Sequence, residues 1–434
     1  MIGHGVHEHK ARSSPNRSGR AVRGCAAVLP GVWLVVAACG TDTSPKPVTF
    51  AGSAVGREAD VIRRQLERFE AARPDISVEV RATPDAADTR RQLYVQWLNA
   101  RAADPDVLQL DVIWTAEFAA AGWILDLAPF APPARDFFAA AIAANRWDGR
   151  LYALPWFVDV GMLYWRSDLA DRPPATFDEL LAQTARAGLP LGFVWQGARY
   201  EGLVTVFLEH LGGFGGRILD EAGLVVIDSD EAVRALTFMR DAIYEHGAVP
   251  ADVLAWQEEQ TRFAFQNGQA AFMRNWPYAV ALLQDPSASR VAGRFGVSPM
   301  PAGPGGASTA ALGGSQLAIN ARSDRPDAAY ALVEFLLEPA QMVERAELAG
   351  QYPSRPALYD GDRLAGALGV PPADARRVIE RATARPVTPV YSELSAILQV
   401  HLHRALTRQA EPRAALETAA ADLRALLRRT GLEN

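Results

Sequence analysis

The chain contains very few cysteines, and both lie near its N-terminus. Its 434 residues include only Cys25 and Cys39. If the segment before Cys39 is removed on export, the remaining body has no second thiol with which to form a disulfide. We therefore expect its stability to come from burial of apolar side chains, and a hydrophobic content of 49% is ordinary for a globular protein.

Long apolar runs and charge of one sign are missing as well. After Cys39 no apolar run approaches the roughly 20 residues that a membrane-spanning helix needs, so we expect a soluble body. The net charge is -6, and acidic and basic residues are interspersed without a basic stripe. Proteins that bind nucleic acids gather Lys and Arg on one face, so no nucleic-acid partner is expected. The length fits one large bilobed unit or two domains.

The sequence also offers no pattern for a metal or a phosphate group. Past residue 39 the chain has four histidines, and His401 and His403 are two residues apart, which does not place them on one helical face. The glycine cluster at 212–216 follows a predicted helix, whereas a phosphate-binding loop precedes one. We expect a tight turn there, and neither a metal nor a cofactor.

The N-terminal segment has the order of a bacterial lipoprotein signal. Four arginines, Arg12, Arg17, Arg20 and Arg23, precede an apolar segment at 25–37, which is too short to span a bilayer and is followed by Ala38 and Cys39. This order predicts a signal peptide at 1–38 and lipidation of Cys39, with the polar, proline-bearing segment 39–47 as a tether. The protein would be exported and anchored to the outer face of the cytoplasmic membrane.

Strands and helices alternate along the first part of the body. Strands are predicted at 48–51, 76–80 and 107–114, with helices at 58–72 and 90–102; Leu93, Trp97 and Leu98 would face inward from the second helix. This alternation predicts a parallel sheet, with ligands beyond the carboxyl ends of its strands, near Asp111. Further helices are predicted at 177–187, 203–211, 230–246, 256–267, 327–337 and 410–429, and a strand at 295–301.

Several short motifs follow one another in the same order as in a known family. They are DPDV at 104–107 with DVIW at 111–114, LYALP at 151–155, GFVWQG at 192–197 with YEGL at 200–203, FQNGQAAF at 265–272, RNWPY at 274–278 and RPVTPVY at 385–391. Together they resemble the extracellular solute-binding proteins of sugar ABC transporters (family 1), most closely the trehalose- and maltose-binding lipoproteins. The likeness covers nearly all of the chain after the tether.

The resemblance implies a fold and a function. The fold would be α/β, the two-lobed periplasmic-binding-protein fold of type II, like maltose-binding protein, with the ligand cleft between the lobes. The first lobe would comprise 48–155 plus 301–345, and the second 156–300 plus 346–434. The function would be to capture a di- or oligosaccharide by hinge closure and deliver it to ABC permease subunits with their ATPase. We expect a monomer and not an enzyme.

The resemblance also implies which residues surround the sugar. Carboxylates and guanidinium groups would form charge-assisted hydrogen bonds with hydroxyls, aromatic rings would stack on the sugar's C–H faces, and a glycine would allow close approach of the backbone. These residues are Glu58, Arg91, Asp111, Asp159, Glu201, Trp276, Gly314 and Arg385, with Gln92, Tyr200, Tyr278 and Ser315 as weaker candidates.

Three departures from the family pattern leave the identity of the sugar open. Arg57 stands where relatives tend to have an amide, Phe157 where a tyrosine is common, and Ser315 where a tryptophan follows the glycine pair. Two alternatives also stay open at this point. The same fold could bind a glycerol phosphodiester or a polyamine, and paired carboxylates in a sugar cleft are also what a glycoside hydrolase uses.

Overall fold

The computed structural model describes residues 46–53 and 57–432 of the chain. The predicted signal peptide at 1–38, the predicted lipidation site Cys39 and most of the tether lie outside the described residues. The described residues all belong to one compact unit.

A six-stranded sheet contains the predicted strands of the first part of the chain. Its order is β12-β6-β11-β3-β1-β2. β1 pairs in parallel with both β2 and β3, so the predicted parallel sheet is confirmed. β11, which we did not predict, is inserted antiparallel between β3 and β6. The strands are β1 (Val48–Gly52), β2 (Val78–Ala82), β3 (Val107–Asp111), β6 (Ala153–Val160), β11 (Leu312–Ile319) and β12 (Tyr352–Pro353).

A second sheet has four strands in the order β10-β7-β9-β8. β7 pairs antiparallel with β9 and β10, and β8 pairs in parallel with β9. Its strands are β7 (Met162–Arg166), β8 (Leu191–Val194), β9 (Ala270–Asn275) and β10 (Phe295–Ser298), and a small separate ladder is formed by β4 (Arg146–Trp147) and β5 (Arg150–Leu151).

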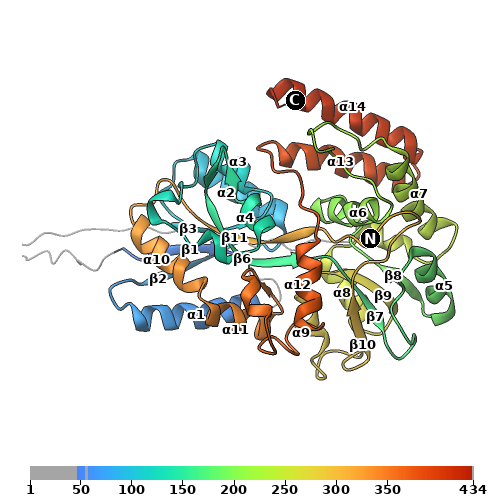
Figure 1. Cartoon of the computed structure of the whole chain (residues 1–434), viewed down its shortest axis with the longest axis horizontal. Helices are drawn as coiled ribbons and strands as arrows, with labels where there is room; N and C mark the ends of the chain where they lie inside the picture. The colour runs from blue at the N-terminus through green and yellow to red at the C-terminus, as the bar shows by residue number, and fades with distance from the viewer. Residues whose placement is uncertain (1–45, 54–56, 433–434) are drawn as a thin grey trace, which may run out of the picture. The chain divides into compact units, whose positions relative to one another are not determined.

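Two groups of helices accompany the sheets (Figure 1). α1, α10 and α11 contact one another, and α10 and α11 contact strands of the six-stranded sheet; α6, α7, α13 and α14 form a second packed group. The helices are α1 (Glu58–Ala72), α2 (Ala87–Asn99), α3 (Thr115–Ala120), α4 (Ala139–Ala144), α5 (Phe177–Ala187), α6 (Glu201–Gly213), α7 (Asp230–Tyr244), α8 (Glu258–Gln266), α9 (Ala279–Leu283), α10 (Pro326–Leu336), α11 (Pro339–Ala349), α12 (Pro372–Glu380), α13 (Tyr391–Leu406) and α14 (Pro412–Thr430).

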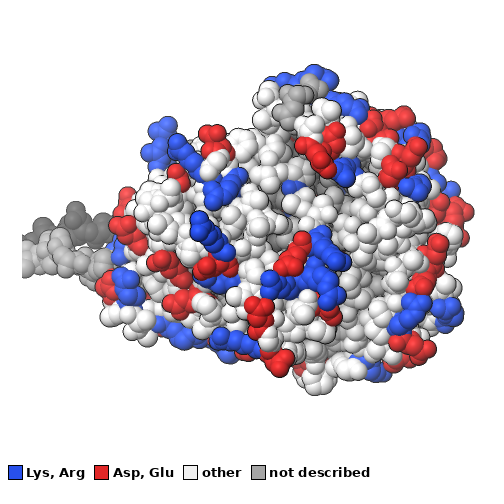
Figure 2. Space-filling model, viewed as in Figure 1, with Lys and Arg blue, Asp and Glu red and all other residues white. Residues whose placement is uncertain are grey.

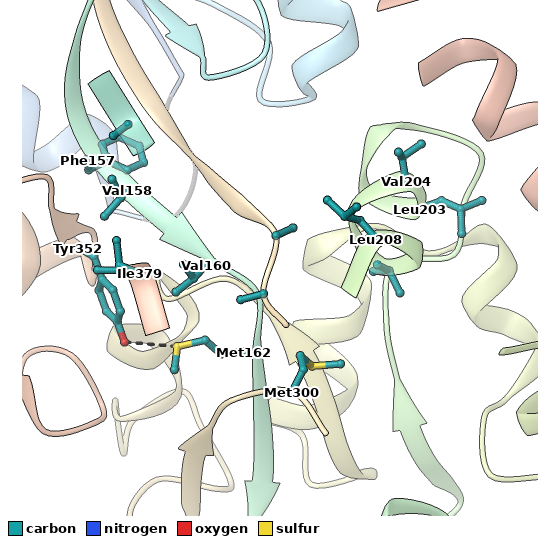
Figure 3. Close-up of a cluster of buried hydrophobic side chains, with 14 of the residues drawn as sticks. Phe157, Val158, Val160, Met162, Leu203, Val204, Leu208, Met300, Tyr352 and Ile379 are labelled. Carbon is teal, nitrogen blue, oxygen red and sulfur yellow. Dashed lines mark hydrogen bonds between the residues drawn. The ribbon is translucent and has the colours of Figure 1, made fainter. Parts of the chain in front are cut away.

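The chain passes from one sheet to the other at Gly161, the single residue between β6 and β7. Apolar side chains of β6, β7, α6 and neighbouring segments pack around this crossing, and the Tyr352 hydroxyl contacts the sulfur of Met162 at 3.4 Å (Figure 3). The chain crosses again between β10 and β11. The predicted segments of the first lobe end at residues 155 and 345. The six-stranded sheet extends beyond both residues, because β6 and β12 belong to it. The lobe ranges themselves stay a prediction.

The surface of the described part carries both signs of charge. Figure 2 shows acidic and basic side chains side by side over the face in view. Within residues 46–53 and 57–432, none of the helices combines the length and the apolar character required to cross a bilayer.

Candidate functional site

A cavity of about 450 Å³ lies between strands of the six-stranded sheet and segments that adjoin the four-stranded sheet. The six-stranded sheet contributes the C-terminal parts of β3 and β6 and the N-terminal part of β11, and the other wall comes from the starts of α6 and α8 and the segment after β9. The lining residues are Ser53, Glu58, Asp85, Ala86, Ala87, Arg90, Gln109, Asp111, Phe157, Asp159, Tyr200, Glu201, Gly202, Thr205, Gln257, Glu258, Glu259, Gln260, Trp276, Tyr278, Gly313, Gly314, Ser315, Gln351 and Arg385.

Most of the residues named from the sequence lie in this cavity. The lining includes all four predicted carboxylates and three of the four weaker candidates, together with the predicted tryptophan, glycine and C-terminal arginine: Glu58, Asp111, Asp159, Glu201, Trp276, Gly314, Arg385, Tyr200, Tyr278 and Ser315. Arg91 and Gln92 do not line it. Gln92 is exposed, and Arg91 donates through Nε to Glu117 at 2.9 Å.

The rotation of α2 explains the position of Arg91. The buried residues of this helix are Arg90, Tyr94 and Leu98, which follow one another at four-residue spacing on one face. Adjacent helical residues point about 100° apart, so Arg90 reaches the cavity while Arg91 faces Glu117. Arg90 Nη1 donates to the carbonyl oxygens of Pro84 and Asp85 at 3.0 and 2.9 Å. The sequence analysis missed Arg90 because it assigned the inward face to Leu93, Trp97 and Leu98.

Arg385 joins carboxylates that belong to different elements. Its Nη1 donates to Glu201 at the start of α6 at 2.7 Å, and its Nη2 donates to Asp111 at the end of β3 at 3.2 Å. Glu201 also accepts from the Tyr391 hydroxyl at 2.8 Å and from Ser395. Burial raises the pKa of Glu201, although the positive charge of Arg385 opposes that shift. The three charged groups therefore fix one another in the cavity wall.

Among the predicted carboxylates, Asp159 is the one whose burial is least offset by hydrogen bonds. It lies on β6 opposite Gly313 of β11, and its Oδ1 is buried without a hydrogen-bond partner among the described residues. Burial and the negative charges of Glu58 and Asp111 raise the pKa of Asp159 to about 7, against the opposing charges of Arg274 and Arg385. At neutral pH this carboxylate would gain from a donor supplied by a ligand.

Aromatic side chains lie on the opposite wall. The Trp276 indole is half-buried, and its Nε1 donates to Glu258 at 3.4 Å. The Tyr278 hydroxyl donates to Glu259 at 2.7 Å. Such rings supply contact area for the C–H faces of a ligand with little side-chain entropy to lose.

A chain of hydrogen bonds forms the floor on the six-stranded sheet. Gln109 Nε2 donates to the Ser315 hydroxyl at 2.9 Å, and the backbone N–H of Ser53 donates to Gln109 Oε1 at 2.8 Å. Beside them, Glu58 accepts from Ser53 and Gln351. Ser315 thus belongs to a polar floor.

The contact between β11 and β6 requires a glycine at position 314, a reason that the sequence analysis did not give. The φ of Gly314 is +114°, and a Cβ built there would lie 2.3 Å from the Phe157 carbonyl oxygen. The glycine therefore allows β11 to approach β6 closely at a shift in their register, next to Ser315.

Other lining residues were also missed by the sequence analysis. Ser53 follows β1 and Gln109 lies two residues before Asp111 on the same face of β3, so strand alternation and the rule on strand ends could have identified both. Gln351 and the first turn of α8, residues 257–260, gave no such signal, because only the tertiary fold brings them to the cavity.

Five buried polar atoms of the lining side chains have no hydrogen-bond partner among the described residues: the Tyr200 hydroxyl, which can donate or accept, and four atoms of charged and amide side chains. Two are donors, Arg90 Nε and Arg385 Nε, and two are acceptors, Asp159 Oδ1 and Gln351 Oε1. Buried polar atoms are usually paired, so their presence around one cavity indicates a polar ligand with both donors and acceptors.

The cavity is also rich in negative charge. Seven carboxylates line it, against the guanidinium groups of Arg90 and Arg385. In the part of the chain that the structure describes, no group of three or more His, Cys, Asp or Glu side chains has an arrangement that could hold a metal ion.

Comparison with known proteins identifies the family. Residues 56–343 match the family described as bacterial extracellular solute-binding protein. The chain belongs to this family. A probable ABC transporter-binding protein of Deinococcus radiodurans is 36% identical to this solute-binding protein over 390 residues, which cover 86% of this chain and 91% of the relative.

Solved structures agree with this assignment. Maltose-bound MalE3 of T. maritima is 43% identical, with a TM-score of 0.84 over 88% of this solute-binding protein and 100% of that chain. The GacH receptor of Streptomyces glaucescens, solved unliganded and with acarbose, is 24% identical with a TM-score of 0.79 over 88% and 98% of the two chains, and shows the shared fold. The predicted two-lobed α/β fold and the predicted membership of the ABC-transporter solute-binding proteins are confirmed.

Proposed function

We propose that this ABC-importer solute-binding protein captures a di- or oligosaccharide of the trehalose or maltose type. The observation that carries the proposal is the set of buried unpaired atoms around a cavity of about 450 Å³, which comprises two donors, two acceptors and the Tyr200 hydroxyl, which can do either. A sugar hydroxyl both donates and accepts, so one class of group can pair with Asp159 Oδ1 and with Arg385 Nε. MalE3, 43% identical, was solved with maltose bound.

The same atoms argue against the two alternative ligands. A polyamine offers donors only and would leave Arg90 Nε and Arg385 Nε without acceptors. The phosphate of a glycerol phosphodiester would enter a cavity that seven carboxylates line, where like charges repel. A neutral polyhydroxylated ligand avoids both conflicts.

The proposed cycle begins with binding between the two walls. The sugar would contact Asp111 and Asp159 on the six-stranded sheet and Trp276 on the other wall, and a hinge at the crossings would close over it. A ligand shifts this equilibrium only by its higher affinity for the closed state. A micromolar Kd, about 8 kcal/mol of binding free energy, would suffice. The closed form would then dock on the permease subunits with their ATPase.

We further propose that the protein is exported, cut before Cys39 and held by lipid at the outer face of the cytoplasmic membrane as a monomer. The family is one of extracellular binding proteins, and its members are transporter components and not enzymes. The first lobe would comprise 48–155 plus 301–345, and the second 156–300 plus 346–434. Metabolic labelling with a palmitate analogue, with Cys39→Ser as the unlabelled control, tests the anchor.

Titration calorimetry tests the ligand. The soluble form starting at Thr41 is titrated with trehalose, maltose, sucrose and longer oligosaccharides. We expect a saturable heat with one sugar, lost in Trp276→Ala and retained in Phe263→Ala, which removes an exposed ring outside the cavity. Heat only with spermidine or glycerophosphocholine would contradict the sugar assignment, and turnover of an aryl glycoside would contradict the role as a binding protein.

A further inference from the structure

Two charged residues outside the cavity lining are completely buried and paired. Arg274 lies on β9 and Glu209 on α6, and both side chains have 0% exposure. Arg274 Nε donates to Glu209 Oε2 at 2.8 Å, its Nη2 donates to the other carboxylate oxygen, and its Nη1 donates to Gln196 Oε1 at 3.1 Å. The guanidinium plane is thus held by hydrogen bonds from all three of its nitrogens.

This pair contacts the aromatic wall of the cavity. The central carbon of the Arg274 guanidinium lies 3.9 Å from the centroid of the Trp276 ring. A cation over an indole face is attracted by the ring quadrupole, and the attraction is stronger where water is excluded. One face of the ring is therefore covered by Arg274, while Trp276 itself lines the cavity.

The pair also contacts both crossings between the sheets. A Cβ built on Gly161 would lie 1.7 Å from Glu209 Oε1 and 2.5 Å from Arg274 Nη2. The backbone N–H of Ala311, just before β11, donates to Glu209 Oε1 at 3.4 Å. The fixed guanidinium therefore joins the site's indole to the two segments at which the chain changes sheets.

Stability alone does not account for this arrangement. A buried ion pair can often be replaced by uncharged groups of similar volume without loss of stability, because the pair must overcome the desolvation of two charges. A planar guanidinium held on every side provides something that an apolar side chain does not, namely a fixed cationic surface against one face of an indole.

We propose that Arg274, oriented by Glu209, is a positioning residue for ligand binding. It covers one face of Trp276 and fixes the ring, so that a ligand ring stacks on the other face. The positioning of the indole stands independently, whereas the stacking of a sugar on it rests on the proposed function.

The test uses a variant that removes both charges together. Arg274→Met with Glu209→Gln avoids an unpaired buried charge, and the amide oxygen of the introduced glutamine keeps an acceptor for the Ala311 N–H. Protein labelled with 5-fluorotryptophan gives one ¹⁹F resonance per tryptophan, and Trp276→Phe assigns the relevant one. We expect this resonance to shift and broaden in the double variant. An unchanged resonance would overturn the positioning role, whether or not any sugar binds.

Affinity provides the second readout. We expect the double variant to raise the sugar Kd about tenfold, and to change it less than twofold when Trp276 is already alanine, because the effect acts through that ring. The matched control is Arg166→Met with Asp168→Asn, a paired arginine and aspartate at the end of β7 outside the cavity lining, which should leave both readouts unchanged. Equal losses with and without Trp276 would overturn the proposal, whereas a wild type that binds no sugar would instead contradict the proposed function.

Discussion

Asp159→Asn should make the ligand-free protein more stable at neutral and alkaline pH, although it removes a residue of the proposed site. Burial and the charges of Glu58 and Asp111 raise the pKa of Asp159 from its ordinary 3.8 to about 7. Between these values the folded protein holds a proton that the unfolded chain has already lost. The contribution of Asp159 to the free energy of unfolding therefore falls as pH rises through this window and is lowest above pH 7.

The magnitude follows from the pKa difference. At 1.36 kcal/mol for each unit of pKa, a rise from 3.8 to about 7 corresponds to a cost of about 4 kcal/mol above pH 7, and to almost nothing below pH 4. Asparagine carries no charge at any of these pH values. We therefore expect the gain in the variant to grow from near zero at pH 4 toward that limit at pH 8.

Urea unfolding at pH 4.5, 6 and 8 measures this difference. The midpoint should move upward in the variant with an unchanged slope, and the movement should increase with pH. Asp106→Asn is the matched control: this buried carboxylate accepts from the backbone N–H of Thr49 at 2.8 Å and is not among the charges that raise the pKa of Asp159, so its loss should not stabilise the protein at any of the three pH values. Equal stability of wild type and Asp159→Asn at pH 8 would refute the reasoning.

Three further predictions concern the site and the crossing beneath it. Sugar affinity should weaken as pH falls below 7, by up to about tenfold per pH unit, because protonated Asp159 accepts hydroxyl donors less well; calorimetry should show a flatter profile in Asp159→Asn. Gly161→Ala would place a Cβ 1.7 Å from Glu209 Oε1 and should lower the free energy of unfolding by about 3 kcal/mol or more; an unchanged Tm contradicts this. Arg385→Met leaves Glu201 buried without its cation and should cost about 3–5 kcal/mol in urea unfolding, and a loss below about 1 kcal/mol would mean that the pair contributes little.

Local patterns in the sequence predicted the parallel strands β1, β2 and β3 and several helices. The apolar positions of 58–72 recur at helical spacing, and α1 spans the same residues; α5 likewise spans the predicted 177–187. β11 was missed because its segment contains Gly313 and Gly314, which weaken a strand pattern. Only the surrounding fold explains these two glycines, since β11 lies between β3 and β6 and must approach β6 closely at Gly314.

Which residues line the cavity could be predicted where a family motif fixed their positions, and less well where the rotation of a helix determined which side chain faces the cavity. Asp111 and Asp159 lie in the cavity as expected, whereas a rotation of α2 by one residue exchanges Arg91 for Arg90. A helix whose buried positions are an arginine, a tyrosine and a leucine does not show its inner face by hydrophobicity alone. The buried pair of Arg274 and Glu209 was also beyond prediction, because 65 positions separate its members.

The unpaired atoms of the cavity and the raised pKa of Asp159 have a common consequence. Both lower the stability of the ligand-free protein, and under the proposed function the hydroxyl groups of a sugar would relieve both. A ligand that pairs with these atoms therefore gains affinity in two ways: it removes the cost of leaving them unpaired, and it forms contacts of its own. A ligand that supplies only donors or only acceptors leaves at least two of the five atoms unpaired. Under the proposed function, the polar arrangement of the walls would thus select for the hydroxyl group itself, before the shape of the cavity discriminates among sugars.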